Sequence, residues 1–113
     1  MIDTSNITDF TAMFNGCRSL TCVPKLDTSK AISLRTMFYG CWSLQHVPHF
    51  DTSNATEMYG FLSSCYPIQE IPHFNTSKAT NLGEAFNGTS IRSIPLLDTS
   101  NVTEMSSMFN GCK

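Results

Sequence analysis

The chain of 113 residues repeats itself every 24 residues. The shared template reads D-T-S-[NK]-[IAV]-x-x-[FLM]-x-x-x-[FL]-x-[GS]-[CT]-x-[SP]-[LI]-x-x-[VI]-P-x-[LF]. Its copies run over 3–26, 27–50, 51–74, 75–97 and, in part, 98–113, and the fourth copy is one residue short between Thr89 and Ser90. A fixed period of this length is typical of solenoids, in which each repeat buries its apolar face against its neighbours. We therefore predict a single repeat domain over residues 1–113.

The middle of each repeat has the pattern of a short helix. In the last copy Asn101 precedes Glu104 by three residues, as in a capping box, and the pairs Asn6/Asp9 and Asn54/Glu57 repeat this spacing. Apolar residues follow at i, i+3, i+4 and i+7, which is one face of a helix. Gly16, Gly40, Gly88 and Gly111, with Ser64 in the third copy, stand where a left-handed helix C-cap is expected. The apolar set comprises Phe10/Met13/Phe14/Cys17, Leu34/Met37/Phe38/Cys41, Met58/Phe61/Leu62/Cys65, Leu82/Ala85/Phe86 and Met105/Met108/Phe109/Cys112.

A brief extended segment is expected after each helix. The first copy reads Leu20-x-x-Val23-Pro24-x-Leu26, and the later copies have the same form. A proline in each of these segments limits the strand, because proline has no N–H to donate. Stacked strands of this kind advance about 4.8 Å per repeat, so each position of the template should become a column of side chains.

An Asp-Thr-Ser corner opens each repeat. Short polar side chains bond nearby backbone groups in turns, so we expect Asp27 and Asp51 to accept hydrogen bonds from the turn. Asn75 stands in the same column, which indicates that the position needs an acceptor rather than a charge. A calcium ladder is the alternative interpretation of this column.

The repeat unit resembles a known family. The segment D-T-S-N-V-T-E-M-S-S-M-F-N-G-C, with S-L-x-x-[VI]-P after it in other copies, is similar to the BspA-like leucine-rich repeats and to the mycoplasma lipoprotein-associated repeats of bacterial surface proteins. This resemblance, which covers 2–113, implies an α/β fold: a right-handed leucine-rich-repeat solenoid with one short strand and one short helix per repeat. It also implies a cell-surface or secreted location, a role in adhesion or recognition, and no enzyme activity.

Composition narrows the partners. Only 14% of the residues are charged, the formal net charge is −2, and no basic stripe is present, so we expect no nucleic-acid binding. No apolar run reaches the roughly 18 residues of a membrane span. Ile2 falls in the last apolar column of a repeat that is otherwise missing, and neither end carries a polar cap. We interpret the chain as a segment of a longer array, or as one whose ends another chain covers.

Four of the five cysteines, Cys17, Cys41, Cys65 and Cys112, share one column on the apolar face, where Thr89 takes the remaining place. Free cysteine behaves as a small buried hydrophobe, so a row of buried thiols is expected. Their spacing of 24 residues is not that of a zinc finger. Cys22 lies in a different column, and we expect it to be exposed and available for an intermolecular disulfide.

Two surface patches are candidate binding sites. One contains His46, His49, Glu70 and His73, which neighbouring repeats should bring together. These side chains could hold a divalent metal, but solvated surface polars are the interpretation that we favour, and no metal or cofactor is predicted.

The other patch is the column of Arg18, Trp42, Tyr66 and Lys113, which follows the cysteine column and should point outward. Arginine, tryptophan and tyrosine are enriched in interface hot spots, and aromatic rings also stack on sugars. The alternative is that Trp42 and Tyr66 stack on each other and shield the edge of the repeat. Tyr39 and Tyr59 would extend this surface.

The resulting hypothesis is a binding module that recognises a protein or glycan on another cell or matrix. The rival hypothesis is a structural element whose uncapped ends, including Ile2 and Met108/Phe109, stack into homo-oligomers or filaments. A hydrolase would need a polar pocket outside the repeat pattern, and no acid, base and nucleophile trio is visible in the template.

Overall fold

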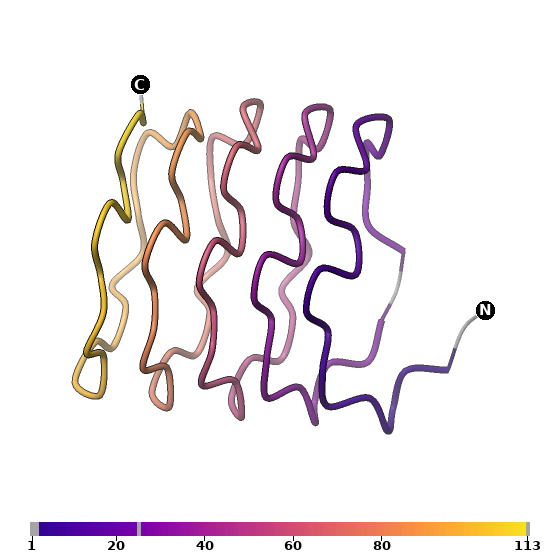
Figure 1. Ribbon diagram of the computed structural model, residues 1–113, viewed down its shortest axis with the longest axis vertical. Coiled ribbons are helices and arrows are strands. Elements are labelled where there is room, and N and C mark those ends of the chain that lie inside the picture. Colours follow the sequence, from indigo (N-terminus) through magenta and orange to yellow (C-terminus); the bar gives the residue numbers. More distant parts are fainter. Residues whose placement is uncertain (1–2, 25, 113) are drawn as a thin grey trace.

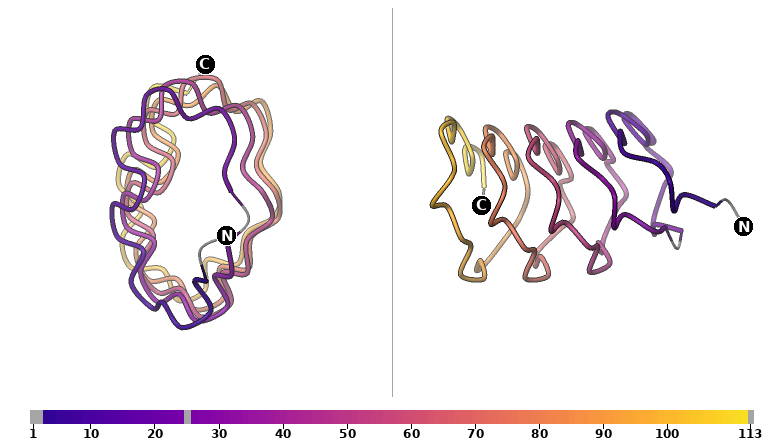
Figure 2. Two further views of the ribbon diagram at one scale, coloured as in Figure 1. Left: turned by 90° about the vertical axis from the view of Figure 1, so that its right-hand side faces the viewer. Right: turned by 90° about the horizontal axis from the view of Figure 1, so that it is seen from below.

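The computed structural model describes residues 3–24 and 26–112 (Figure 1). Each repeat forms one coil of the chain, and successive coils lie side by side. We name them coils 1 to 5, for residues 3–26, 27–50, 51–74, 75–97 and 98–112. A view along the stack shows the coils in register around a common interior (Figure 2). The whole measures 36 × 35 × 19 Å. Ile2 and Lys113, which entered the predictions above, lie outside the described residues.

The predicted α/β leucine-rich-repeat solenoid, with one helix and one strand per repeat, is wrong. Across residues 3–24 and 26–112 the backbone forms no α-helix, and its only β-structure consists of isolated parallel bridges. These bridges join Asp9 to Ser33, Ser33 to Glu57, Glu57 to Asn81 and Asn81 to Glu104, one residue from each coil. The coils are therefore built of consecutive turns.

Left-handed residues prevent the helix. In every coil the tenth and fourteenth residues have positive φ, for example Ala12 (59°) and Gly16 (75°) in coil 1 and Thr36 (49°) and Gly40 (74°) in coil 2. An α-helix needs an unbroken run of right-handed residues, so it cannot pass through these positions. The carbonyl of Phe10 instead accepts a hydrogen bond from the N–H three residues later, at 3.2 Å, around left-handed Ala12. This is the pattern of a type II turn.

The remaining N–H groups of this segment bond the next coil. The N–H groups of Phe10, Ala12, Phe14 and Gly16 donate to carbonyls of coil 2 at 2.7–2.9 Å, and the same ladder recurs between the later coils. These donors are thereby withdrawn from any helix. A helix of about eight residues is marginal by itself, whereas a ladder repeated in every coil is stabilised by its neighbours.

The predicted capping boxes are also wrong, because their acidic members bond locally. The carboxylates of Asp9, Glu57 and Glu104 accept hydrogen bonds from the N–H two residues on, at 2.7–2.9 Å. The amides of Asn54 and Asn101 donate to carbonyls of the preceding coil, at 2.8 and 2.7 Å. Each side chain therefore stabilises a turn or joins two coils.

The segment predicted as a strand forms the opposite wall of each coil, and no β-bridge was found in its described residues. Its contacts between coils are sparse, as in the bonds from the N–H of Ser90 to the Ile68 carbonyl (2.9 Å) and from that of Arg92 to the Gln69 carbonyl (3.0 Å). Proline in each copy removes one donor, which keeps this wall irregular.

The apolar columns face the interior as predicted, although the helix that was to present them is absent. In coil 3 Phe61 is fully buried between Phe38 and Phe74, with ring centroids 5.6 and 5.5 Å away in edge-to-face contacts. The outermost coils bury less, and Met13 and Phe109 are partly exposed. Consecutive turns that place every fourth residue inward reproduce part of the apolar period of a helix. The fully buried members in coils 2 to 4 are Leu34, Met37, Phe38, Cys41, Met58, Phe61, Leu62, Cys65, Leu82 and Ala85.

The Asp-Thr-Ser corners confirm the prediction that this column supplies acceptors. Oδ1 of Asp27 accepts hydrogen bonds from the Ser29 N–H (3.0 Å) and hydroxyl (2.6 Å). Oδ1 of Asn75 does the same for Ser77, at 3.0 and 2.7 Å. The buried threonine hydroxyl of each corner donates to the backbone of the next coil, as Thr52 does to the Asn75 carbonyl at 2.8 Å. The corner thus satisfies its own turn and fastens the following coil.

These corners should make the fold sensitive to acid. Hydrogen bonds from the Ser29 hydroxyl and N–H lower the pKa of Asp27 below its ordinary value. A lowered pKa in the folded state stabilises the protein above the unfolded pKa of about 3.9, and this stability is lost as the pH falls through the folded value. Replacing Ser29 with alanine should raise the pKa of Asp27 and weaken the acid dependence. Carboxyl NMR titration and urea unfolding at neutral and acid pH measure both quantities.

Ser77→Ala is the matched control, because it removes the same hydroxyl from Asn75, which does not titrate. It should lower stability equally at both pH values. An acid dependence that changes as much in Ser77→Ala as in Ser29→Ala would contradict the assignment.

Candidate functional site

Arg18, Trp42 and Tyr66 form an exposed ladder across coils 1 to 3, and we name these three residues the aromatic ladder. Cζ of Arg18 lies 4.0 Å from the Trp42 ring centroid, and the Trp42 and Tyr66 centroids are 6.1 Å apart at an interplanar angle of 38°. Trp42 is 45% exposed and Tyr66 50% exposed. The predicted outward direction of this column is confirmed. Both interpretations of it hold in part, since the rings are exposed and also contact each other.

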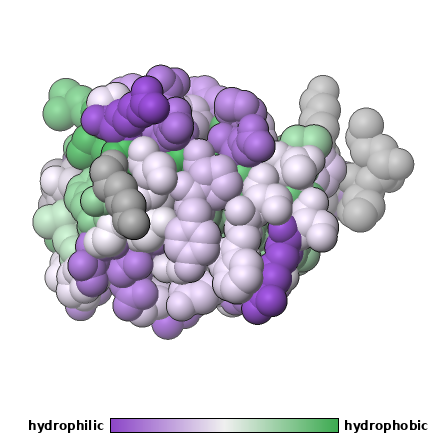
Figure 3. Space-filling model, turned by 90° about the horizontal axis from the view of Figure 1, so that it is seen from above, coloured by the Kyte–Doolittle hydropathy of each residue, from purple (hydrophilic) through white to green (hydrophobic). Residues whose placement is uncertain are grey.

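A tight turn positions each member of the ladder. In coil 2 the Leu44 N–H donates to the Cys41 carbonyl at 3.3 Å, and both of these side chains are buried. Trp42 lies inside this turn, between two residues that are anchored in the core, so its side chain projects outward. Coils 1 and 3 have the equivalent turn bonds. The turns lie at the upper ends of the coils in Figure 1, and Figure 3 shows this mostly polar end of the molecule from above.

The ladder stops at coil 4. This coil is one residue short between Thr89 and Ser90, which removes the residue that would follow Tyr66 in the column. Thr89 is buried in the cysteine column, and the Ser90 hydroxyl donates to the Tyr66 carbonyl at 2.7 Å. The shortened turn therefore packs against the backbone of coil 3 and supplies no side chain to the ladder.

The predicted histidine patch divides between two hollows. His46, His49, Glu70 and His73 are all exposed. His46 and Glu70 line a hollow of about 530 Å³ together with Gln45, Pro67 and Gln69. His49 and His73 line a second hollow of about 560 Å³ beside the Asp-Thr-Ser corners. In the part of the chain that the structure describes, no group of three or more histidine, cysteine, aspartate or glutamate side chains could hold a metal ion.

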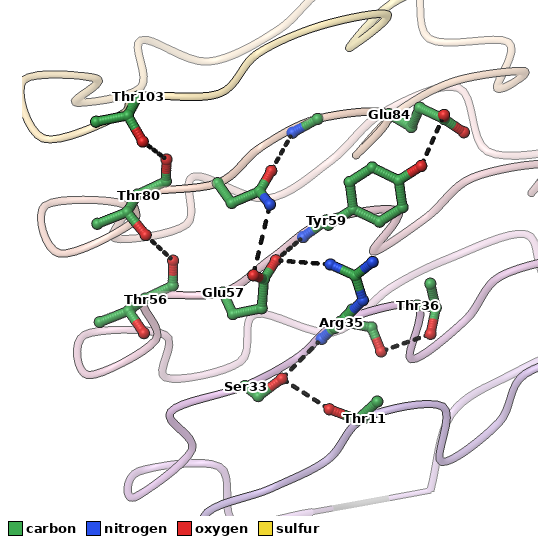
Figure 4. Close-up of polar contacts among 12 residues, drawn as sticks. Thr11, Ser33, Arg35, Thr36, Thr56, Glu57, Tyr59, Thr80, Glu84 and Thr103 are labelled. Atoms are coloured by element: carbon green, nitrogen blue, oxygen red, sulfur yellow. Dashed lines mark hydrogen bonds and ion pairs between the residues drawn. The ribbon is translucent and has the colours of Figure 1, made fainter.

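A second cluster of polar and aromatic side chains was not predicted as a site. Cζ of Arg35 lies 4.4 Å from the Tyr59 ring centroid and its guanidinium is 3.7 Å from Glu57, while the Tyr59 hydroxyl donates to Glu84 at 2.8 Å (Figure 4). The bond to Glu84 raises the pKa of Tyr59. Because each of these groups has an internal partner, the cluster fastens coils 2 to 4 and leaves few groups for a ligand. Its signal in the sequence was the spacing of 24 or 25 residues between successive members.

The cysteine column is buried only in its middle. The thiols of Cys41 and Cys65 donate to the carbonyls of Phe14 and Phe38 in the preceding coils, at 3.1 and 3.0 Å. The neighbouring Cys41 thiol, together with burial, raises the pKa of Cys65, which makes its thiolate inaccessible as a nucleophile. Cys17 and Cys22 are exposed, and Cys112 is partly exposed. The expected exposure of Cys22 is confirmed, and all five thiols are free.

Between residues 3 and 112, Lys25 apart, no helix is long and apolar enough to cross a membrane.

These features define the class of protein: a tandem-repeat protein in which each repeat supplies one coil and one residue to each surface column. The family model described as "Mycoplasma protein of unknown function, DUF285" matches residues 1–93 and 66–113, so the chain belongs to this family. Comparison with curated proteins and with solved structures found no match.

Proposed function

We propose that the protein is a non-enzymatic binding module of a cell-surface or secreted protein, and that the aromatic ladder is its contact surface. The supporting observation is the exposure of Trp42 and Tyr66, about half of each side chain, in a chain whose other aromatic residues are mostly buried. Exposed tryptophan, tyrosine and arginine side chains in contact with one another are typical of interface hot spots.

The rigidity of the ladder adds to this proposal. Each member is held by a turn whose flanking residues are buried, and Arg18 is stacked on Trp42. Side chains that are ordered before binding lose little conformational entropy when a partner arrives. The resemblance of the repeats to BspA-like surface proteins agrees with a role in adhesion to a protein or glycan of another cell or matrix.

Replacing Trp42 with alanine should reduce binding at least about 30-fold, because loss of a hot-spot residue costs about 2 kcal/mol or more. Stability should change little, since half of the side chain is already in solvent. Binding to a panel of matrix proteins and surface glycans, with urea unfolding in parallel, measures both effects. Tyr39→Ala is the control, because Tyr39 is an exposed aromatic outside the ladder. Loss of folding in Trp42→Ala would show that Trp42 is structural.

A second candidate function is assembly, which the edges of the stack favour. No described residue accepts from the N–H groups of Ser107 and Phe109 in coil 5, and none donates to the carbonyls of Thr11 and Met13 in coil 1. These groups occupy the positions that form the ladders between the inner coils. Such edges pair with a further coil of the same template, which a longer chain or a second copy supplies.

Light scattering over a range of concentrations, with and without reductant, tests assembly. Stacking through the edges predicts growth with concentration that reductant does not reverse. A species that reductant dissolves would place the joint at exposed Cys22 instead. A monomer at all concentrations would exclude assembly of this chain.

A further inference from the structure

The missing residue of coil 4 leaves one face of Tyr66 without a neighbour in the ladder. Trp42 is stacked between Arg18 and Tyr66, so its ring presents mainly an edge to solvent. Tyr66 has Trp42 on one side only, and on the other side the chain passes from buried Thr89 directly to Ser90. Tyr66 is accordingly the most exposed aromatic side chain described, at 50%. We name the space beside it, one coil wide, the Tyr66 notch.

We propose that the Tyr66 notch binds a pyranose ring of a glycan, which stacks on the open face of Tyr66 in place of the missing residue. This inference rests on the proposed function and names the ligand class of the same ladder. The face of an aromatic ring is apolar and carries a partial negative charge, which attracts the weakly positive C–H groups on one side of a sugar ring. Within the protein the ladder already stacks a guanidinium on Trp42 and a ring on a ring, so its spacing accepts a flat group.

The polar groups near the notch suit hydroxyls. Pro67, the residue after Tyr66, lines the hollow of about 530 Å³ that also contains Gln69 and Glu70. Arg92 is exposed on coil 4, where its N–H bonds the Gln69 carbonyl. Carboxylates accept, guanidinium groups donate, and amides do both, so this set can bond sugar hydroxyls, which also do both.

Charge argues against the other ligand classes. Glu70 and Arg92 carry opposite charges, so the surroundings of the notch hold no excess of cations for a phosphate and none of carboxylates for a basic peptide. The side chains that line the hollow are, apart from Pro67, polar, whereas the centre of a protein–protein hot spot is apolar and desolvated. A neutral, hydroxyl-rich ligand matches both the ring and its surroundings.

The test uses the single tryptophan of the chain as its probe, because Trp42 contacts Tyr66 and its fluorescence reports on the notch. The ligands are trisaccharides of β-1,4-linked glucose, β-1,4-linked N-acetylglucosamine, β-1,4-linked galactose and α-linked mannose. We expect at least one of them to bind with a millimolar or lower Kd. Tyr66→Phe should bind that sugar within about threefold of the wild type, and Tyr66→Ala should bind it at least about tenfold more weakly.

An insertion variant tests the notch itself. A tryptophan inserted between Thr89 and Ser90 restores the 24-residue repeat and should cover the open face of Tyr66, which abolishes sugar binding. Its own fluorescence would confuse the signal, so its binding is followed by NMR of the sugar protons. A glycine inserted at the same place is the control, because it restores the length without a side chain and should retain part of the binding. Urea unfolding verifies that each variant is folded.

The outcomes separate this inference from the proposed function. If no sugar binds the wild type, the glycan assignment is overturned, while Trp42-dependent binding of a protein would leave the proposed function in place. If a sugar binds equally well to the wild type, Tyr66→Ala and the tryptophan insertion, the site lies elsewhere. If neither a sugar nor a protein binds in a Trp42-dependent way, both the inference and the proposed function fail.

Discussion

Replacing Phe61 with alanine should lower the free energy of unfolding by about 4 kcal/mol, because the change leaves a large cavity in the centre of the stack. Phe61 is fully buried in coil 3, and its ring contacts Phe38 in coil 2 and Phe74 in its own coil. The loss therefore weakens packing within one coil and between two. Because each coil contacts only its neighbours, the change should also divide the cooperative unit into two parts.

Urea unfolding followed by Trp42 fluorescence and by circular dichroism measures this effect. The matched control is Phe109→Ala in coil 5, where the ring stacks on Phe86 but remains 39% exposed. We expect that control to cost less than half as much, since part of its surface is already in water. Equal losses at the two positions would contradict the central place of Phe61 in the core.

Replacing Gly40 with valine should cost about 2 kcal/mol. Gly40 has φ +74°, and the nearest atoms to an added Cβ are 3.9–4.0 Å away, so the substitution meets a strained backbone without a steric clash. A β-branched residue is particularly unfavourable in this region. Gly40→Asn should cost clearly less, because asparagine tolerates left-handed φ better than other residues with a side chain. Equal stabilities of the two variants in thermal and urea unfolding would contradict this account.

The opposite change at Thr36 distinguishes the turn from the helix that the sequence predicted. Thr36 is a β-branched residue with φ 49°, so Thr36→Gly should raise stability by about 1 kcal/mol. In a helix the same change would lower stability, because glycine is the poorer helix former. The sign of the change in unfolding free energy therefore tests the backbone conformation directly.

Part of the candidate site could be predicted from the column positions. Arg18, Trp42 and Tyr66 follow a cysteine that points inward, so their outward direction follows from the template. The contacts between them depend on the separation and tilt of the coils, which no single repeat encodes. The missing residue between Thr89 and Ser90 is visible in the sequence, but only the packing of coil 4 against the Tyr66 carbonyl shows that the ladder ends there.

The sequence by itself determined the period, the repeat boundaries, the columns that face the core and the acceptors of the Asp-Thr-Ser corner. Each of these depends on residue type and spacing, which are properties of one repeat. It did not determine the secondary structure, because an apolar spacing of i, i+3, i+4 and i+7 serves a helix and also a pair of turns with left-handed residues. The choice depends on where the backbone N–H groups find partners, and in this protein they find them in the adjacent coil. Only the tertiary structure brings that coil within reach, so only it could decide between the two.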